Sequence, residues 1–207
     1  MNLESTSLLG RLIHLEPLSR EHVAGLVDAS SGDRKLYPWS LVPEGVNEAS
    51  RYVDTALAWR EAGSAVPFAI VRAADQAIIG STRFWNIEHW AWPESHERHG
   101  RKQPDACDIG FTWLAADAVG TGANTEAKLL MLEQAFERWN VLPVCFHTDG
   151  RNERSRAALE RMGATFEGVL RARRMAADFT PRDSYRYSIL VDEWPSTKER
   201  LTQRLKC

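Results

Sequence analysis

A glycine-rich segment between a strand-like and a helix-like stretch constrains this chain most. The apolar stretch Cys107–Leu114 is typical of a strand and Thr125–Trp139 is typical of a helix, and Gly120 and Gly122 lie between them. Two glycines one residue apart let the backbone approach a ligand closely. A helix that begins directly after them directs unpaired N–H groups and the positive end of its dipole at the same place. The segment Val119–Lys128 therefore predicts a loop that holds phosphates.

Two familiar phosphate-binding loops do not account for this segment. An NTPase loop needs Lys followed by Ser or Thr directly after its last glycine, whereas Ala123 and Asn124 follow Gly122. A dinucleotide-binding loop needs a third small residue where Thr125 stands and an acidic residue about 20 positions later, so this interpretation has only weak support. When the segment is considered alone, a glycine-rich turn without a ligand also stays open.

A second pattern supports a ligand-binding interpretation. Asn152 to Ser155 follow a strand-like stretch and open a short helix, which ends at Gly163. Residues Ile78 to Leu205 contain the motifs NTEAKLLML, TDGRNERSRAALERMGATFEGVLR, RDSYRYSIL and EWP in this order. With these motifs the segment resembles the RimJ/RimL-like branch of the GNAT superfamily, the ribosomal-protein alanine N-acetyltransferases and their relatives. Gly120 and Gly122 match the family's pyrophosphate loop, which is Gln or Arg, two residues, Gly, one residue, then Gly or Ala.

Strand-like stretches that alternate with helix-like ones predict an α/β sheet with mixed strand directions, and we expect one domain over residues 1–207. The resemblance implies the GNAT acyl-CoA N-acyltransferase fold, which has a mixed, mostly antiparallel central sheet flanked by helices. It also implies transfer of an acetyl group from acetyl-CoA to a primary amine by direct attack. The acceptor would be a protein N-terminus or a small molecule.

The predicted acetyl-CoA site combines the end of a strand, the glycine loop and the turn after the next strand. Backbone N–H groups of the loop would hold the pyrophosphate, and in the family a backbone N–H on the preceding strand, here within Thr112–Leu114, faces the thioester oxygen. Asp117 stands where the family usually has Gln or Arg, and we expect its carboxylate to point away from the phosphates. The residues assigned to acetyl-CoA are Trp113, Leu114, Val119, Gly120, Thr121, Gly122, Ala123, Asn124, Thr125, Lys128, Asn152 and Ser155.

Ser155 is the predicted general acid for the departing CoA thiolate. Many GNAT enzymes carry a Tyr seven residues after the Asn, and Leu159 occupies that position here. RimL-like enzymes carry a Ser three residues after the Asn, which Ser155 matches, and its hydroxyl would hydrogen-bond the sulfur or donate a proton. Asn152 would hydrogen-bond the pantetheine arm. The structural alternative for both residues is a helix cap.

The amine attacks only when it is neutral, so a base or a chain of waters is expected. Asp108 opens the strand before the loop, where relatives often carry a Glu, and Glu167 is the second candidate. Some RimL-like relatives have a carboxylate further along the strand after Glu167. This chain has Arg171, Arg173 and Arg174 there, which weakens a transfer of that assignment. An ordered water is the alternative base.

Trp39, Trp85 and Trp90 are the predicted contacts of the acceptor. The segment Glu88–Asp105 is too long for a tight hairpin, and its aromatic residues are candidates to line the acceptor site. The alternatives are a surface insertion for this segment and core packing for Trp39. We expect no metal site, because no Cys or carboxylate cluster completes a tetrahedral set with the histidines of the segment.

Composition and charge narrow the class of protein to which this chain can belong. With 207 residues, of which 43% are hydrophobic, the chain is long enough for one sizeable core. A net charge of −2 gives no global attraction to nucleic acid or to a membrane surface, and no stretch approaches the roughly 18 apolar residues that span a bilayer. Cys107, Cys145 and Cys207 show no metal-ligand spacing and fit a reducing compartment. We expect a cytoplasmic protein, and RimL-like relatives suggest a homodimer.

Two other functions stay open. Leu159 in place of Tyr, together with Asp117, permits a CoA-binding module without turnover. A nucleotide-binding oxidoreductase is supported only by the two glycines and is disfavoured.

Overall fold

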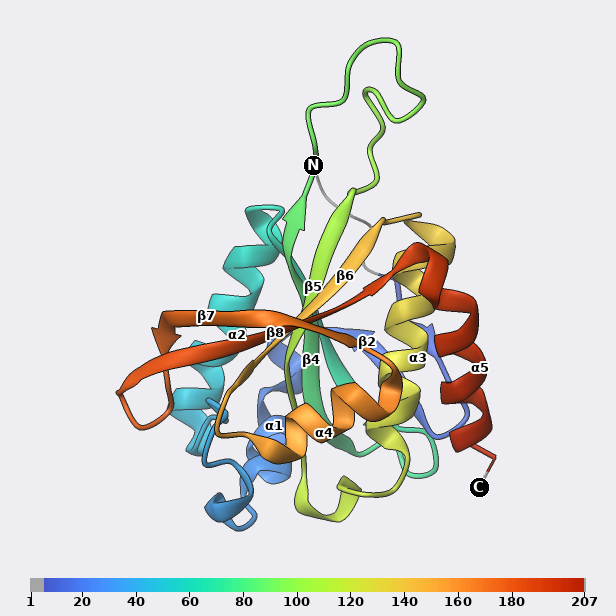
Figure 1. The fold of residues 1–207 in the computed structure, drawn as a ribbon. Helices are drawn as coiled ribbons and strands as arrows, with labels where there is room; N and C mark the ends of the chain where they lie inside the picture. Colours follow the sequence, from blue (N-terminus) through green and yellow to red (C-terminus); the bar gives the residue numbers. More distant parts are fainter. Residues whose placement is uncertain (1–5, 207) are drawn as a thin grey trace.

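One eight-stranded sheet organises the protein, with helices on both of its sides (Figure 1). The computed structural model describes residues 6–206. The strands lie in the order β1-β2-β3-β4-β5-β6-β8-β7. Their bounds are β1 Leu8–Leu9, β2 Ile13–Pro17, β3 Ala65–Arg72, β4 Ile78–Glu88, β5 Ala106–Leu114, β6 Pro143–Asp149, β7 Thr165–Met175 and β8 Pro181–Leu190.

The helices form two groups on either side of the sheet (Figure 1). Helices α1 and α2 pack against each other and against β3 and β4, whereas α3 packs against β2 and α5, and α4 contacts β6 and α5. Helix α3 continues into a π-helical segment, Gln134–Arg138. The α-helices are α1 Val23–Ser30, α2 Gly45–Glu61, α3 Ala123–Glu133, α4 Glu153–Met162 and α5 Trp194–Arg204.

One strand pair differs from all the others in the described sheet. Strands β5 and β6 are parallel, and their pairing is limited to Cys107 with Val144 and Asp108 with Cys145. The other neighbouring strands pair in antiparallel fashion. The expected mixed, mostly antiparallel sheet flanked by helices is therefore confirmed.

Local sequence signals explain how the two helices after β5 and β6 begin and end. Gly122 precedes α3 with φ 91°, a left-handed conformation that glycine adopts without steric cost. Asn152 caps α4, since its Oδ1 accepts from the Ser155 N–H at 3.0 Å, and Gly163 ends α4 with φ 106°. The turn residues thus fix where both helices start relative to the preceding strands.

A buried carboxylate fixes the first turn of α3 against the sheet. Glu126 accepts hydrogen bonds from the backbone N–H groups of Arg11, Leu12 and Ile13 at 3.0, 2.6 and 2.8 Å. A Cβ atom at Gly10 would lie 2.6 Å from Glu126 Oε2, so this approach requires glycine. The helix start that follows the glycine loop is therefore held rigidly.

A single hydrophobic cluster joins both halves of the sheet, from Ile13 on β2 to Ile189 on β8. Cys107 and Cys145 are both buried. Within residues 6–206, no helix is long and apolar enough to cross a membrane. The same residues contain no group of three or more His, Cys, Asp or Glu side chains arranged to hold a metal ion.

Candidate active site

The parting of β5 and β6 creates the central feature of the site. Beyond Asp108 and Cys145, β5 continues to pair with β4 as far as Leu114, and β6 continues to pair with β8 as far as Asp149. The two strands run in the same direction, and each is followed by a helix, α3 or α4. Both helix starts therefore lie at the open end of the gap. The carboxyl ends of adjacent parallel strands are a preferred place for ligands in α/β proteins.

The loop between β5 and α3 presents unpaired donors. Gly120 and Gly122 have φ values of 84° and 91°, and the Thr121 hydroxyl donates to the Ala118 carbonyl at 2.8 Å. The Ala123 N–H donates to Thr121 Oγ1 at 3.4 Å. Several neighbouring N–H groups donate to no acceptor in the part of the chain that the structure describes. These are the N–H groups of Gly120, Thr121, Gly122, Asn124 and Thr125. Such a cluster at a helix start is suited to an anion.

Asp117 is engaged by a basic residue from outside the loop. Its Oδ2 lies 2.5 Å from Arg72 Nη2 on β3, and Arg72 also contacts Asp75. The hydrogen bond to Asp117 raises the pKa of Arg72. The negative charge of Asp117 is therefore neutralised locally, beside a hollow of about 510 Å³ that Arg72, Asp117 and Thr121 help to line.

Lys128 points behind β5. Its side chain is buried, and Nζ donates to Thr112 Oγ1 at 2.6 Å. Thr112 Oγ1 lies 2.7 Å from Thr82 Oγ1 on β4. Burial lowers the pKa of Lys128 to about 7. This arrangement supports the strand beside the gap, and the Lys128 ammonium forms no hydrogen bond with the loop among the described residues.

At the start of α4, the side chains of Asn152 and Ser155 have different contacts. Asn152 provides the helix cap, as the structural alternative for this residue predicted. The contact with Asn152 uses the Ser155 backbone N–H, and the Ser155 hydroxyl forms no hydrogen bond within residues 6–206. Ser155 is half-buried, so its hydroxyl is available to a ligand at the open end of the gap.

A bulge distorts β5 in its pairing with β4. Ser81 pairs with Trp113 and Arg83 pairs with Gly110, so Phe111 and Thr112 together face one residue of β4. Phe111 has φ 53°, which is unusual for a bulky side chain and costs of order 1–3 kcal/mol. Its ring is held by edge contacts with Trp59 and Trp85. The bulge interrupts the ladder to β4 just where β5 has left β6.

Asp108 and His147 meet where the gap begins. Asp108 Oδ2 and His147 Nε2 are 3.3 Å apart, and both side chains are largely buried. Burial raises the pKa of Asp108 to about 6, whereas burial and the guanidinium groups of Arg186, Arg174 and nearby arginines lower the pKa of His147 to about 4. At neutral pH the pair consists of a carboxylate beside a neutral imidazole.

Glu167, the second carboxylate considered as a base, has a different environment. Its Oε2 lies 2.6 Å from Arg186 Nε, and its side chain is 36% exposed. Arg186 also donates to Cys145 Sγ at 3.2 Å. Glu167 is thus an ion-pair partner at the rim, whereas Asp108 lies at the inner end of the gap.

The three tryptophans assigned to the acceptor occupy different places. Trp85 pairs with Asp108 across β4 and β5, and its ring lies near His147 and under Arg174. Trp39 lies against the guanidinium of Arg151, which binds Asp149 at the end of β6 and Asp178 in the β7–β8 turn. These two residues therefore border the gap.

Trp90 is not brought to the gap. It belongs to the Glu88–Asp105 segment, which projects from the end of the sheet opposite the glycine loop (Figure 1). Its side chain is 41% exposed. The segment is held by the buried Asp105, which accepts from the Trp90 N–H and from Trp92 Nε1, both at 2.8 Å.

Other assigned residues lie along β5 and the loop. Trp113 is buried against Tyr37, and the Tyr37 hydroxyl donates to the Leu114 carbonyl at 2.8 Å. Val119 is 39% exposed and Ala123 is buried. These contacts fix the end of β5 directly before the loop.

Several polar residues at the gap were not singled out in the sequence. They are His147, Arg83, Arg182 and Arg186. A signal was present, because polar residues alternate along β6 as Cys145, His147 and Asp149 and along β8 as Arg182, Ser184 and Arg186. Alternate residues of a strand share one face.

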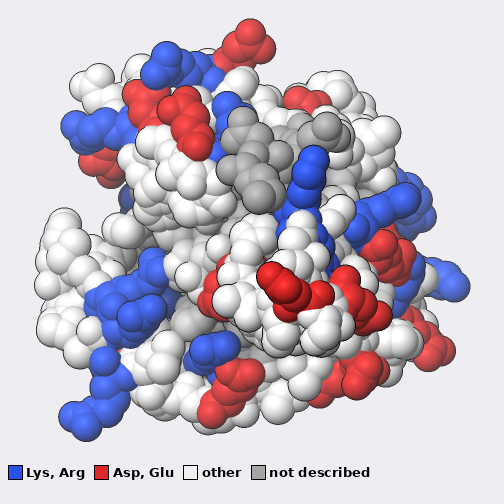
Figure 2. Space-filling view, turned by 90° about the horizontal axis from the view of Figure 1, so that it is seen from above, with Lys and Arg blue, Asp and Glu red and all other residues white. Residues whose placement is uncertain are grey.

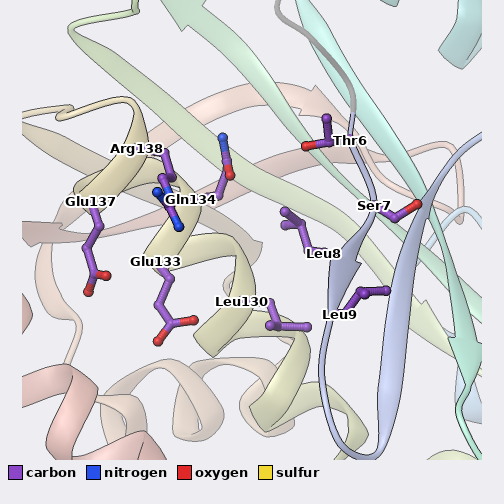
Figure 3. A pocket seen from close by; sticks show the side chains of 9 residues that line it. All are labelled: Thr6, Ser7, Leu8, Leu9, Leu130, Glu133, Gln134, Glu137 and Arg138. Carbon is purple, nitrogen blue, oxygen red and sulfur yellow. The ribbon is translucent and has the colours of Figure 1, made fainter.

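A further hollow, of about 530 Å³, is lined by residues outside the glycine loop. Figure 3 shows their side chains. Leu8 and Leu9 line it from the N-terminal strand, and residues from Leu130 to Arg138 line it from the far end of α3 and the π-helical segment. Its two carboxylates, Glu133 and Glu137, are both bound by Lys198. It does not extend the site described above.

Comparison with known proteins gives consistent matches. The acetyltransferase (GNAT) domain family matches residues 12–165. YdaF of Bacillus subtilis, named as a candidate ribosomal N-acetyltransferase, is 27% identical over 194 residues, which cover 89% of this chain and 92% of YdaF. A crystal structure of a candidate acetyltransferase from T. thermophilus is 31% identical, with a TM-score of 0.78 and coverage of 99% of this chain and 100% of that chain. RimJ of Mycobacterium smegmatis, in complex with a CoA disulfide, has a similar fold, with a TM-score of 0.74, 22% identity and coverage of 93% and 88%.

Proposed function

We propose that this chain, which belongs to the GNAT acetyltransferase family, transfers an acetyl group from acetyl-CoA to a primary amine. The observation that carries the proposal is the gap between β5 and β6, at whose open end α3 and α4 both begin. We further propose that residues 1–207 act as one acetyltransferase domain, because one hydrophobic cluster joins both sides of the gap.

The residues at the open end fit acetyl-CoA. The unpaired N–H groups from Gly120 to Thr125 are suited to its pyrophosphate, and the unpaired strand edges beyond Asp108 and Cys145 are suited to its amide-containing arm. When bound, acetyl-CoA supplies the activated thioester. Arg72 offsets the charge of Asp117, which reduces the repulsion that this carboxylate would exert on phosphates.

Two groups of the chain would act on the thioester, one at its oxygen and one at its departing sulfur. The bulge at Phe111 interrupts the ladder to β4, so that a backbone N–H within Thr112–Leu114 is the candidate donor to the thioester oxygen. The Ser155 hydroxyl, which has no hydrogen-bond partner among the described residues, is the candidate to hydrogen-bond or protonate the sulfur. Asn152 would then contribute by holding Ser155 at the helix start.

Asp108 is the better supported base. A pKa of about 6 leaves its carboxylate mostly ionised at neutral pH, yet basic enough to accept a proton from an amine through direct contact or one water. Glu167 is already paired with Arg186 at the rim. His147 Nε2 lies 3.3 Å from Asp108 Oδ2 and borders that carboxylate.

The acceptor is proposed as a primary amine, without naming the molecule that carries it. The name of YdaF, a candidate ribosomal N-acetyltransferase, supports a protein N-terminus as the acceptor, and the catalytic elements equally accommodate a small amine. Trp39 and Trp85 border the gap and are the candidates to contact it. Homodimer formation also remains a proposal, which analytical ultracentrifugation tests directly.

The first experiment is the melting temperature with saturating acetyl-CoA, CoA or NADPH. A ligand at about 100 times its dissociation constant adds roughly 2.7 kcal/mol, which for a chain of this size raises the melting temperature by several degrees. We expect a rise with both CoA forms and none with NADPH. A flat response to both CoA forms would contradict the proposal, and a rise without release of CoA thiol with any amine would favour a silent CoA-binding module.

A further inference from the structure

A set of guanidinium groups without carboxylate partners surrounds the side of the gap that faces α2 and the β7–β8 hairpin. Arg83, Arg174 and Arg182 form no ion pair and donate no side-chain hydrogen bond among residues 6–206. By contrast, Arg151 and Arg186 nearby each bind a carboxylate. The unpaired set is thus a local excess of positive charge in a chain whose net charge is −2.

Arg83 is the most deeply buried member of this set. It is 2% exposed, and its Nε and Nη2 atoms are buried without a hydrogen-bond partner. The rings of Phe111, Tyr52 and Trp59 surround its guanidinium at 4.4, 4.8 and 5.4 Å. Aromatic rings attract a cation but do not neutralise it, and an uncompensated buried charge is costly. An anion near Arg83 would recover part of that cost.

Strand register places these arginines on the same face as the proposed base. Arg83 and Trp85 alternate on β4, and Trp85 pairs with Asp108 on β5. Arg174 lies 4.1 Å from the Trp85 ring, so the β7 strand reaches over this face from the far side of the gap. Arg174 pairs in register with Arg182, whose Nε is also buried without a partner.

Burial disfavours the charge of both hairpin arginines. It lowers the pKa of Arg174, where Arg173 adds to the effect and Asp108 opposes it, and it lowers the pKa of Arg182, where Asp149 opposes the effect and Arg174 and Arg151 add to it. Next to Arg182 on the same strand face, the hydroxyl of Ser184 is fully buried and has no hydrogen-bond partner. Seen from above, Lys and Arg side chains gather at the lower left of the molecule, on the side where Figure 1 draws the free end of the hairpin (Figure 2).

We propose that the amine acceptor carries a carboxylate or phosphate group near its amine, in a small molecule or in the second residue of a peptide, and that Arg174, Arg182 and the buried Arg83 bind this group. The inference rests on the proposed acetyl transfer, because Asp108 beside Trp85 then defines where the amine lies. Arg174 and Arg182 hold the anion at the hairpin, and Arg83 adds a fixed positive charge from the α2 side.

The test compares acceptors that differ only in charge. One pair consists of two peptides of equal length that begin Ala-Glu and Ala-Gln, and the other consists of 4-aminobutyrate and its amide. We expect kcat/KM to be about tenfold or more higher for the acidic member of at least one pair, which is the effect of one charge-assisted hydrogen bond. The pair that shows the preference tells whether the acidic group belongs to a peptide or to a small molecule.

The variants identify the residues responsible. Arg174→Gln and Arg182→Gln should each lower the ratio of the acidic to the neutral acceptor toward one, whereas Arg171→Gln, an exposed change of the same charge on the same strand, should preserve it. Arg83→Met should lower the ratio as well. If this buried change prevents folding, Arg174→Gln and Arg182→Gln still test the inference. A ratio near one in the wild type, or a ratio unchanged in both hairpin variants, overturns the inference.

A binding measurement separates this inference from the proposed function. Both peptides are titrated calorimetrically into the CoA-loaded protein, or into the free protein if CoA causes no rise in melting temperature. Tighter binding of the acidic peptide that is lost in Arg182→Gln supports the inference even when no acetyl transfer is found. Equal affinity for both peptides contradicts it even when the melting temperature responds to acetyl-CoA.

Discussion

At the scale of residues, Asn152 caps α4 and Ser155 keeps a free hydroxyl, a difference that the sequence does not show. Either side chain would suit a helix start, because small polar residues are favoured there. In the structure Asn152 Oδ1 accepts from the Ser155 backbone N–H at 3.0 Å, and the Ser155 hydroxyl is left without a partner among the described residues. Stability and chemistry should therefore respond to different substitutions.

Ser155→Ala should lower kcat for acetyl transfer by roughly 100-fold or more while leaving the melting temperature nearly unchanged, because the cap is retained. The matched variant Asn152→Ala removes the cap and should lower the free energy of unfolding by about 1 kcal/mol. Steady-state assays of thiol release and thermal melts measure both effects. Unchanged transfer by Ser155→Ala would remove its proposed role.

The raised pKa of Asp108 predicts how kcat/KM depends on pH. Since burial raises its pKa to about 6 and the ionised form is the base, its contribution to kcat/KM is present above pH 6 and is lost as the pH falls through 6. The pH profile of the wild type should show a break near pH 6, and Asp108→Asn should lose activity and this break. Glu167→Gln should keep the break, and its disappearance there would assign the base to Glu167 instead.

At the scale of elements, the glycine loop shows why backbone conformation decides the site. Gly120 has φ 84°, and no atom lies within 4 Å of the place where its Cβ would be. A side chain there is strained, but it collides with nothing in the protein. The open space is what a bound phosphate would need.

Gly45 provides a matched control, because its φ is 66° and its Cβ position is also open. Gly120→Ala and Gly45→Ala should each lower the free energy of unfolding by about 1–2 kcal/mol through left-handed strain. Of these two variants, Gly120→Ala should also reduce the rise in melting temperature with CoA. Equal rises in both would show that the loop does not approach the ligand.

Most elements could be predicted because their signals are local. Asn152 and Gly163 delimit α4, and the helix predicted at Thr125–Trp139 corresponds to α3 and its π-helical extension, with a start two residues earlier. The parting of β5 and β6 gave no local signal, because it depends on how each strand pairs on its other side. The positive φ of Phe111 was equally hidden, since nothing in its residue type favours it.

The acceptor side could be predicted least. Trp85 was expected near the acceptor and does border the gap, yet Trp90, another tryptophan from the same part of the chain, lies at the other end of the sheet. The position of Arg174 over Trp85 depends on the β7–β8 hairpin reaching across the gap, which is a tertiary property. Composition could not show it either, because the arginines are balanced by acidic residues elsewhere.

At the scale of the whole molecule, two antiparallel half-sheets, β1–β5 and β6–β8, meet through two residue pairs. Beyond these pairs the backbone groups of both strands lack a ladder between them. Hydrogen exchange should therefore be slowed by acetyl-CoA in residues 109–114 and 146–149. Residues 66–70 of β3 pair on both sides and should change little. Mass spectrometry of deuterated peptides measures this, and equal protection of all three segments would point to global stabilisation instead.

The parted strands have a consequence beyond catalysis. Each is a sheet edge located inside a folded protein, and unpaired edges are templates on which extended segments of other chains add. Proteins usually protect such edges with charge, bulges or a covering element, and the bulge at Phe111 lies in the ladder to β4, on the side of β5 away from the gap. An occupant of the gap would cover both edges, so the ligand-free protein should be the form that aggregates first when it is concentrated or heated.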